Sequence, residues 1–281
     1  MEPRHSLFLP PAWPVFFAFA LALVLARPCP AGTLSIHTRM TAVSGAGTLA
    51  VEVAVENRGT ATAKNVEVVL EADDLRMFSR VAEELPPGGE AGATFRTDVE
   101  AKKPGRYPLA LRVLYTDEDG YPFSAVHGAT FSPIRDEAPG VEVLAPQAQL
   151  AGQGPYEIRI QGAAVGEVRT RARIFLPREI AAERTSLSMI LAPGETVVRF
   201  DLKNQSAMPG ASYPVYVFVE YDAEGVHHTA VGEGSLLVRP RAGWFRRTRG
   251  AWTLAAAACG AAFLFLLALA AVRHVRDRQR G

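Results

Sequence analysis

The sequence is poor in cysteine and in net charge, and each shortage excludes a class of protein. Only two of its 281 residues are cysteines, Cys29 and Cys259, and both lie in apolar stretches near the ends of the chain. The part between them therefore contains no disulfide and has to be stabilised by apolar cores. The formal net charge is +1 at pH 7. Because polyanion binding usually needs a clear basic excess, we expect no nucleic-acid partner.

Catalytic and cofactor motifs are also missing. The sequence has no Gly-x-Ser-x-Gly elbow, no phosphate-binding glycine loop and no His-Glu-x-x-His motif. A catalytic triad is defined by its geometry, so scattered serine, histidine and aspartate residues do not indicate one. We therefore predict that the protein is not an enzyme and has no catalytic residues, cofactor-binding residues, metal ligands or cofactor.

The N-terminal segment has the features of an export signal. Arg4 precedes an apolar run from Val15 to Ala26, which is shorter than the ~20 residues that a membrane-spanning helix needs. Two small-x-Ala cleavage sites follow, and the sequence does not choose between them. Cys29 does not directly follow small residues, as a lipid-acceptor cysteine should. We assign residues 1–31 to a signal peptide.

A second apolar segment, residues 252–272, contains no charged residue. About 21 residues at ~1.5 Å rise cross the ~30 Å hydrocarbon core, so we predict a transmembrane helix here. A basic juxtamembrane linker at 241–251 precedes it, and a basic cytoplasmic tail at 273–281 follows. Arginines on both flanks nearly balance, and the export signal therefore decides the orientation. We expect a single-pass cell-membrane protein whose main domains are periplasmic or extracellular.

Short alternating apolar runs between these segments predict β-strands. Apolar and polar or small residues alternate from Leu49 to Val55, as in a strand with one buried face. A turn sequence, Asn57-Arg58-Gly59, follows, and the alternation resumes from Val66 to Leu70. No helical period of useful length occurs in this region, so we predict an all-β body.

This body repeats itself at a constant offset of 106 residues. Tyr107-Pro108 matches Tyr213-Pro214, and Tyr115 matches Tyr221. A repeat of about 100 residues with short strands is the size of an immunoglobulin-like sandwich. We predict two tandem immunoglobulin-like β-sandwich domains, at 32–136 and 139–240. Each tyrosine of the second pair follows three alternating apolar residues, so we expect both rings to be buried at equivalent strand positions.

Part of the first copy resembles a known group of domains. The stretch VEVAVENRGTATAKNVEVVL, Val51 to Leu70, is similar to the opening of bacterial CARDB-type immunoglobulin-like domains, in which an Asn-x-Gly turn separates two strands. The LPPGGEA turn and the YTDEDG hairpin are similar to that group and to immunoglobulin-like modules of bacterial glycosidases. The resemblance covers residues 33–135, and the second copy lacks the Asn-Gly turn. It implies the fold and an extracytoplasmic setting. Such domains serve as spacers, adhesion units and accessory modules and have no one shared activity.

Several polar residues are candidates for binding, and each has a simpler explanation. The acidic turns, Asp117-Glu118-Asp119 and Asp222 with Glu224, could offer oxygen ligands to calcium, but hairpin geometry also favours Asp and Gly there. His227 and His228 are neighbours on a predicted strand, so they point to opposite faces and are expected to be surface residues that share no metal ion. Asn204-Gln205-Ser206 matches a glycosylation sequon.

Three tyrosines are candidates for sugar binding. We expect Tyr121, Tyr156 and Tyr216 to be exposed, and exposed aromatic rings could stack on sugars. Aromatic residues in strands are more often core residues or cross-strand partners.

These features favour a non-enzymatic structural or interaction protein. We expect it to be anchored in the membrane and to present two immunoglobulin-like domains to an envelope protein or a surface polysaccharide, since sandwiches offer edge strands and end loops for binding. Two alternatives stay open. One is a carbohydrate-binding accessory protein, and the other is an exported protein whose C-terminal helix is a cleaved sorting signal.

Overall fold

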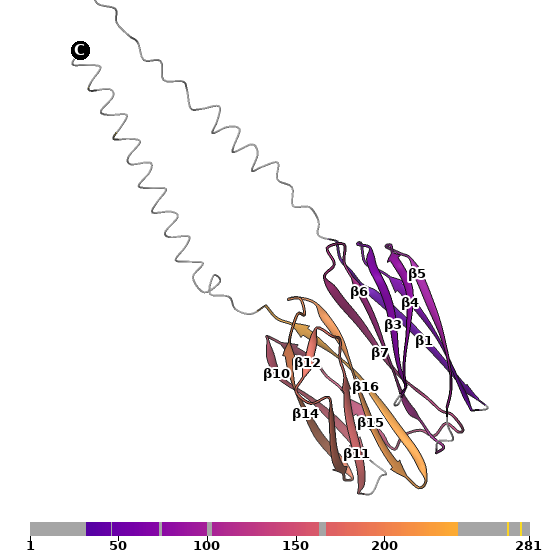
Figure 1. Ribbon diagram of the computed structural model, residues 1–281. Coiled ribbons are helices and arrows are strands. Elements are labelled where there is room, and N and C mark those ends of the chain that lie inside the picture. Colours follow the sequence, from indigo (N-terminus) through magenta and orange to yellow (C-terminus); the bar gives the residue numbers. More distant parts are fainter. Residues whose placement is uncertain are drawn as a thin grey trace, which may run out of the picture.

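The computed structural model describes residues 32–45, 47–72, 75–99, 103–162 and 167–240, with Leu269 and Arg276 as single positions. Sixteen strands occur in these residues, arranged as four sheets in two stacked pairs (Figure 1). The all-β prediction is therefore confirmed. Among the described residues no helix is long and apolar enough to cross a membrane. The predicted signal peptide, linker, transmembrane helix and tail lie outside the described residues, those two positions excepted.

The first sandwich contains strands β1 to β7. One sheet has the order β1-β2-β5 and the other β4-β3-β6-β7, with antiparallel neighbours throughout. Its core gathers the alternating residues predicted from the sequence, among them Val51 and Leu111, which are fully buried. The strand bounds are β1 (Ile36–Gly45), β2 (Thr48–Asn57), β3 (Ala63–Ala72), β4 (Leu75–Leu85), β5 (Glu90–Asp98), β6 (Tyr107–Thr116) and β7 (Pro122–Phe131).

The second sandwich has its own core and strands β8 to β16. Its sheets have the orders β12-β14-β10-β8 and β13-β11-β15-β16-β9. The strand bounds are β8 (Val141–Leu144), β9 (Gln147–Leu150), β10 (Gln153–Gly162), β11 (Val168–Phe175), β12 (Ile180–Ala182), β13 (Ser186–Leu191), β14 (Gly194–Asn204), β15 (Ser212–Ala223) and β16 (Val226–Val238).

The two sandwiches place the repeated tyrosines at equivalent positions. Tyr115 lies in β6 and Tyr221 in β15. Each of these strands forms the last hairpin of its sandwich, β6 with β7 and β15 with β16. Tyr115 is 8% exposed and Tyr221 3%. Each ring stacks on the residue opposite in the hairpin, Phe123 at 5.8 Å and His228 at 4.9 Å between centroids. The predicted equivalence and burial of the two tyrosines are confirmed.

Tyr107 and Tyr213, the other matched pair, begin β6 and β15 and tie these strands to the preceding loops. The hydroxyl of Tyr107 donates to the carbonyl of Lys103 at 3.1 Å, and the hydroxyl of Tyr213 accepts from the backbone N–H of Met208 at 2.9 Å. A tyrosine at this strand start whose hydroxyl bonds upstream backbone is the tyrosine corner of immunoglobulin-like sandwiches.

The copies differ at their first strand. β1 is continuous, whereas its counterpart is divided into β8 and β9 by Ala145 and Pro146. Proline has no N–H for a ladder and interrupts a strand. After the break the chain changes sheets: β8 pairs antiparallel with β10, and β9 pairs parallel with β16.

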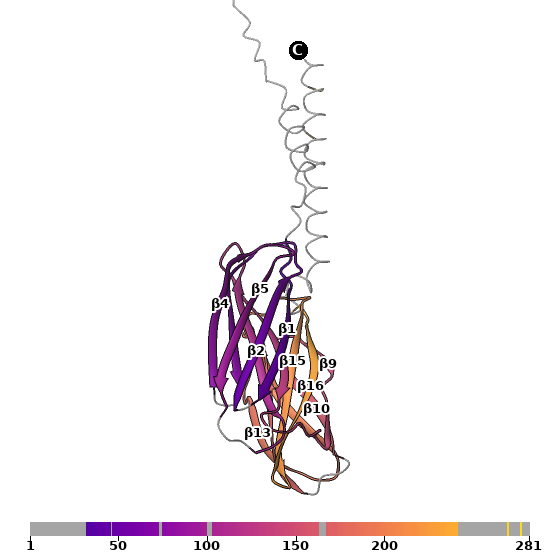
Figure 2. The same cartoon turned by 90° about the vertical axis from the view of Figure 1, so that its right-hand side faces the viewer.

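The two sandwiches lie side by side, and the chain folds back on itself between them (Figures 1 and 2). The first sandwich has an odd number of antiparallel strands, so the chain enters at one end and leaves at the other. Residues 132–140 connect the sandwiches at that far end. The chain then runs through the second sandwich back to the end at which it entered the first. The start of β1 and the end of β16 therefore share one end of the molecule, while the β15–β16 hairpin lies at the opposite end (Figure 1).

Candidate functional site

An apolar cluster joins the two sandwiches at the middle of their shared face. Ala110 and Val126 come from β6 and β7 of the first sandwich, and Phe175, Tyr216 and Phe218 come from β11 and β15 of the second. Phe218 is fully buried. These positions alternate with the inward-facing residues of their own sandwich cores, so β6 and β15 are buried on both faces. The interface is thus an apolar layer between two complete cores.

Arg112 of β6 crosses this interface beside the apolar cluster. Its guanidinium lies 4.6 Å from the centroid of the Phe175 ring and donates to the carbonyl of Leu176 at 3.3 Å. Glu71 of its own sandwich lies 3.6 Å away. Burial lowers the pKa of Arg112, while the charge of Glu71 opposes that shift. A desolvated cation over an aromatic face contributes up to ~2 kcal/mol.

A buried carboxylate ties the sandwiches together at the end where β1 begins. Glu179, 1% exposed, accepts hydrogen bonds from the backbone N–H of Ser124 at 2.6 Å and from its hydroxyl at 2.7 Å. The Ser124 hydroxyl in turn accepts from the backbone N–H of Arg178 at 2.8 Å. Burial, together with the nearby Glu179 charge, raises the pKa of Tyr115. A buried charge of this kind is tolerated only when it is hydrogen-bonded, so Ser124 and Glu179 fix the register of the interface.

A second tie lies near the β15–β16 hairpin. The backbone N–H of Arg106 donates to the carbonyl of His227 at 2.9 Å, and the N–H of His227 donates to the carbonyl of Pro104 at 2.8 Å. The rings of Tyr107 and His227 stack at 4.3 Å, and Lys103 pairs with Asp222 at 2.8 Å. This contact is close because residue 105 is glycine.

Gly105 combines two features that only glycine tolerates. Its φ is +121°, and a Cβ built there would lie 1.9 Å from the His227 carbonyl oxygen. Three sets of contacts hold the sandwiches together. Backbone hydrogen bonds join them at one end, the Ser124–Glu179 pair joins them at the other, and the apolar layer lies between. Domains move relative to one another unless their interface is apolar and extensive, and these three sets of contacts favour a fixed arrangement of the two sandwiches.

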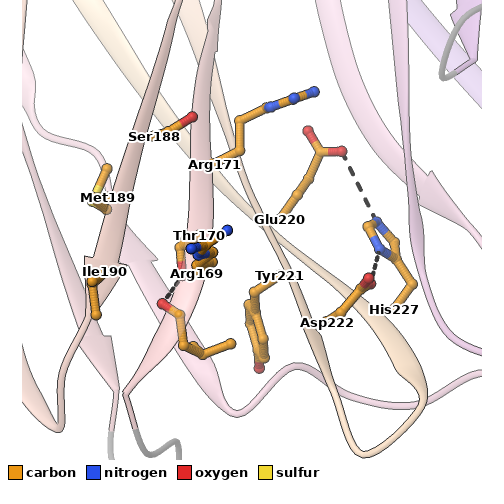
Figure 3. A pocket seen from close by; sticks show the side chains of 11 residues that line it. Arg169, Thr170, Arg171, Ser188, Met189, Ile190, Glu220, Tyr221, Asp222 and His227 are labelled. Carbon is orange, nitrogen blue, oxygen red and sulfur yellow. Dashed lines mark hydrogen bonds and ion pairs between the residues drawn. The ribbon is translucent and has the colours of Figure 1, made fainter.

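A groove of about 690 Å³ is lined by residues of the second sandwich (Figure 3). β11 contributes Arg169 and Arg171, β13 contributes Ser188 to Ile190, and the β15–β16 hairpin contributes Glu220, Asp222 and His227. The groove is open to solvent along β13. It therefore suits an elongated partner better than an enclosed small molecule.

The acidic side chains of the groove already have partners among other residues of the protein. His227 lies between them, with Nδ1 2.7 Å from Asp222 and Nε2 4.0 Å from Glu220. Glu220 also pairs with Arg173 at 3.6 Å. Burial raises the pKa of Asp222, but hydrogen bonds from Lys103 and His227 outweigh it and lower that pKa overall. Each acidic side chain of the groove thus already has a cationic partner, Arg173 for Glu220 and Lys103 for Asp222.

The structure gives the predicted metal candidates other roles. The Asp117 carboxylate accepts from the backbone N–H of Tyr121 at 2.7 Å, as a turn residue does. No group of three or more His, Cys, Asp or Glu residues in the described part of the chain is arranged to hold a metal ion. His227 and His228 lie on opposite faces, as predicted. Both are half-buried: His227 is 18% exposed and stacks on Tyr107 at the interface, and His228 stacks on Tyr221.

The prediction of exposed sugar-binding tyrosines is wrong for two of the three residues. Tyr156 is fully buried and donates to the carbonyl of Pro146 at 2.9 Å, and Tyr216 is 6% exposed inside the interface. Burial raises the pKa of each to about 12. Only Tyr121 is exposed, and its hydroxyl donates to Ser206. The side-chain amide of Asn204, the first residue of the sequon, donates to the carbonyl of Ala207 and accepts from the N–H of the same residue.

The interface itself was missed at the sequence level, although it left a trace. The runs from Tyr107 to Val113 and from Tyr213 to Val219 are almost continuously apolar. A strand covered on one face alternates, whereas a strand covered on both faces reads as a continuous apolar run. Both runs therefore pointed to a second covered face on the central strands.

The fold and the interface define the class: a tandem immunoglobulin-like β-sandwich protein in which both sandwiches form one body. No family model matches the chain, and no curated protein matches it. The resemblance to CARDB-type domains accordingly stays a prediction.

Several solved structures are similar to the chain at low levels. The seventh ScaB type I cohesin from Pseudobacteroides cellulosolvens shares 11% identity over 37% of this chain and 94% of its own, with a TM-score of 0.26. A protein of unknown function from Porphyromonas gingivalis W83 shares 17% over 72% and 99%, with a TM-score of 0.27. The native conformation of Escherichia coli alpha-2-macroglobulin shares 12% over 74% and 17%, with a TM-score of 0.28. Likeness at this level assigns no function.

Proposed function

We propose that the protein is a non-enzymatic, membrane-anchored interaction module that presents a rigid pair of immunoglobulin-like sandwiches outside the cytoplasm. Its partner is an envelope protein or a surface polymer. The observation that carries this proposal is the interface: Ser124–Glu179, the apolar cluster and the Gly105–His227 contact hold two sandwiches as one body. A rigid body presents its binding surface in a fixed position, which lowers the entropic cost of binding.

The path of the chain indicates which end of the body would face the membrane. The described body begins at Gly32 and ends at Pro240, at the same end of the molecule (Figure 2). In the sequence, one apolar terminal segment precedes Gly32 and the other follows Pro240, so both connect to the body at that end. An anchor at 252–272 would then place the β15–β16 hairpin, the Gly105 loop and the neighbouring groove furthest from the membrane. Loops at one end of a sandwich are its usual binding elements.

The topology is tested by labelling introduced cysteines with a membrane-impermeant maleimide in intact spheroplasts. We expect a cysteine at Ser186, an exposed position in β13, to be labelled, and a matched cysteine at Gln279 in the predicted tail to be labelled only after detergent is added. Labelling of Gln279→Cys alone in intact spheroplasts would refute the orientation.

The partner is sought by site-specific photo-cross-linking in the native cells. A photoreactive amino acid at Ser188 in the groove should capture a defined envelope component. The same residue at Glu157, on the opposite sheet of the second sandwich, is the matched control. Equal capture from both positions would argue against a specific binding surface at the groove.

A further inference from the structure

The groove is bordered by a free sheet edge. β13 is the terminal strand of its sheet and pairs only with β11 in the described part of the chain. The backbone N–H of Ile174 donates to the carbonyl of Thr185, which fixes the phase of the antiparallel ladder between the two strands. Donor and acceptor groups alternate sides along such a ladder. The backbone groups of Ser188 and Ile190 therefore point away from β11, toward solvent.

Two arginines on the neighbouring strand form no ion pair with a carboxylate in the described part of the chain. Arg169, Arg171 and Arg173 occupy alternate positions of β11, so all three lie on the outer face of the sheet. Of these, only Arg173 forms an ion pair with a carboxylate among the described residues. Arg169 and Arg171 line the groove and are exposed (Figure 3). Their positive charges are available to a partner.

We propose that an extended acidic segment of another protein adds to β13 as a further strand. Its backbone would pair with Ser188 and Ile190, and its carboxylates would contact Arg169 and Arg171. Alternate residues of an extended segment repeat at ~6.6 Å, which is also the spacing of alternate arginines along β11. A segment with acidic residues at every second position thus matches the charge pattern in register. This inference rests on the proposed function and names its partner's chemistry.

The free edge is what favours a polypeptide over an anionic polysaccharide. Only a peptide offers a backbone that can continue the ladder beyond β13. Ile190 is 65% exposed at the same edge, on the same face as Ser188, and would pack against an apolar side chain of an added strand. An anionic polysaccharide would contact the arginines, but it would neither pair with the edge of β13 nor pack against Ile190.

The test uses the full chain in nanodiscs of zwitterionic lipid, with fluorescent peptides as probes. One peptide alternates glutamate with valine or threonine; a second has the same composition with its glutamates clustered; a third is the alternating peptide N-methylated at every second residue. We expect the first peptide to bind, with an affinity that falls as salt rises. The clustered and N-methylated peptides should bind much more weakly, the latter because it cannot pair with an edge.

Variants of the protein separate charge from edge pairing. The double change Arg169→Gln and Arg171→Gln should weaken binding of the alternating peptide roughly tenfold, through loss of two solvent-exposed ion pairs that reach across β13. Arg159→Gln and Arg199→Gln, two exposed arginines of the opposite sheet, form the matched control and should leave the affinity unchanged. Ile190→Pro should abolish binding by removing an outward N–H, and the N-methylated peptide gives the same information without altering the protein.

Two outcomes would overturn the proposal. One is equal binding of the alternating and N-methylated peptides. The other is binding of polygalacturonate that depends on Arg169 and Arg171 while no peptide binds, which would assign the groove to an anionic polymer. Either result leaves the spheroplast labelling unaffected, so failure of this inference is distinguishable from failure of the proposed topology.

Discussion

At the scale of single residues, the tyrosine pair offers the most direct comparison of the two sandwiches. Tyr115 and Tyr221 share strand position, burial and a stacked cross-strand partner, but they differ at the hydroxyl. The hydroxyl of Tyr221 accepts a hydrogen bond from the backbone N–H of Gly140 at 2.7 Å, in the connection that leads into β8. The ring contributes to the core in both copies, whereas the hydroxyl has a partner of this kind only in the second.

Replacing either tyrosine by alanine should lower the free energy of unfolding by ~3 to 5 kcal/mol, because each change removes a large ring from a packed core. The phenylalanine variants should differ. Tyr221→Phe leaves the Gly140 N–H without its acceptor and should cost ~1 kcal/mol more than Tyr115→Phe. Urea unfolding followed by circular dichroism measures all four, with Tyr121→Ala at the exposed hairpin as the control. Near-neutral alanine variants at both positions would contradict the burial argument.

Histidine titration should make stability depend on pH. Burial lowers the pKa of His127, whose ring lies 5.7 Å from that of Tyr216 across the interface, and burial also lowers the pKa of His228. A histidine with a depressed folded-state pKa favours folding while it is neutral. That stability is present above the unfolded pKa of ~6.5 and is lost as pH falls through the folded-state value.

We therefore expect the free energy of unfolding to decrease between about pH 7.5 and about pH 5. His127→Phe keeps a ring against Tyr216 but cannot be protonated, so this variant should lose less stability over the same interval. Urea titrations at each pH measure the difference. An identical pH dependence in the variant and the unchanged protein would show that His127 does not contribute.

At the scale of elements, the divided first strand of the second sandwich depends on two glycines in β16. A Cβ at Gly232 would lie 2.5 Å from the Val143 side chain, and a Cβ at Gly234 would lie 2.0 Å from the Tyr156 hydroxyl. These glycines allow β8 and the Pro146 turn to approach β16 closely. The repeat in the sequence predicted the strands of both copies well, because alternation and turn residues are local. It did not predict the change of sheets, which depends on Pro146 meeting glycines almost ninety residues later.

Gly232→Ala and Gly234→Ala should each destabilise the second sandwich by ~1 to 3 kcal/mol, the usual cost of overpacking a filled site. Ser235→Ala, at the next position of β16, where the side chain points to the other face of the strand, is the control and should change stability by less than ~0.5 kcal/mol. Thermal unfolding monitored by circular dichroism suffices for the comparison. If both glycine variants are as stable as the control, the close approach of β8 to β16 is not required by the fold.

At the scale of the whole molecule, the relation between the sandwiches was the least predictable feature. The Ser124–Glu179 hydrogen bonds join residues 55 apart, and the groove combines residues of β11, β13 and the β15–β16 hairpin. Local patterns carry no information on such pairs. The continuous apolar runs of β6 and β15 indicate a second covered face, but they do not say what covers it. The sequence likewise shows the arginines of the groove as residues and not as a site, because their position beside the edge strand β13 is a property of the assembled sheet.

A fragment spanning residues 32–240 should be soluble, monomeric at moderate concentration and predominantly β by circular dichroism, since it keeps both cores and omits both apolar terminal segments. We expect it to unfold in one cooperative transition, because the interface couples the two sandwiches at three levels.

Val126→Asp places a charge in the apolar layer without touching either core and should divide the transition in two. Val197→Asp, at a position 55% exposed on β14, is the matched control and should keep one transition. Two separate transitions in the unaltered fragment would mean that the sandwiches fold independently, and the rigid-body argument would then fail.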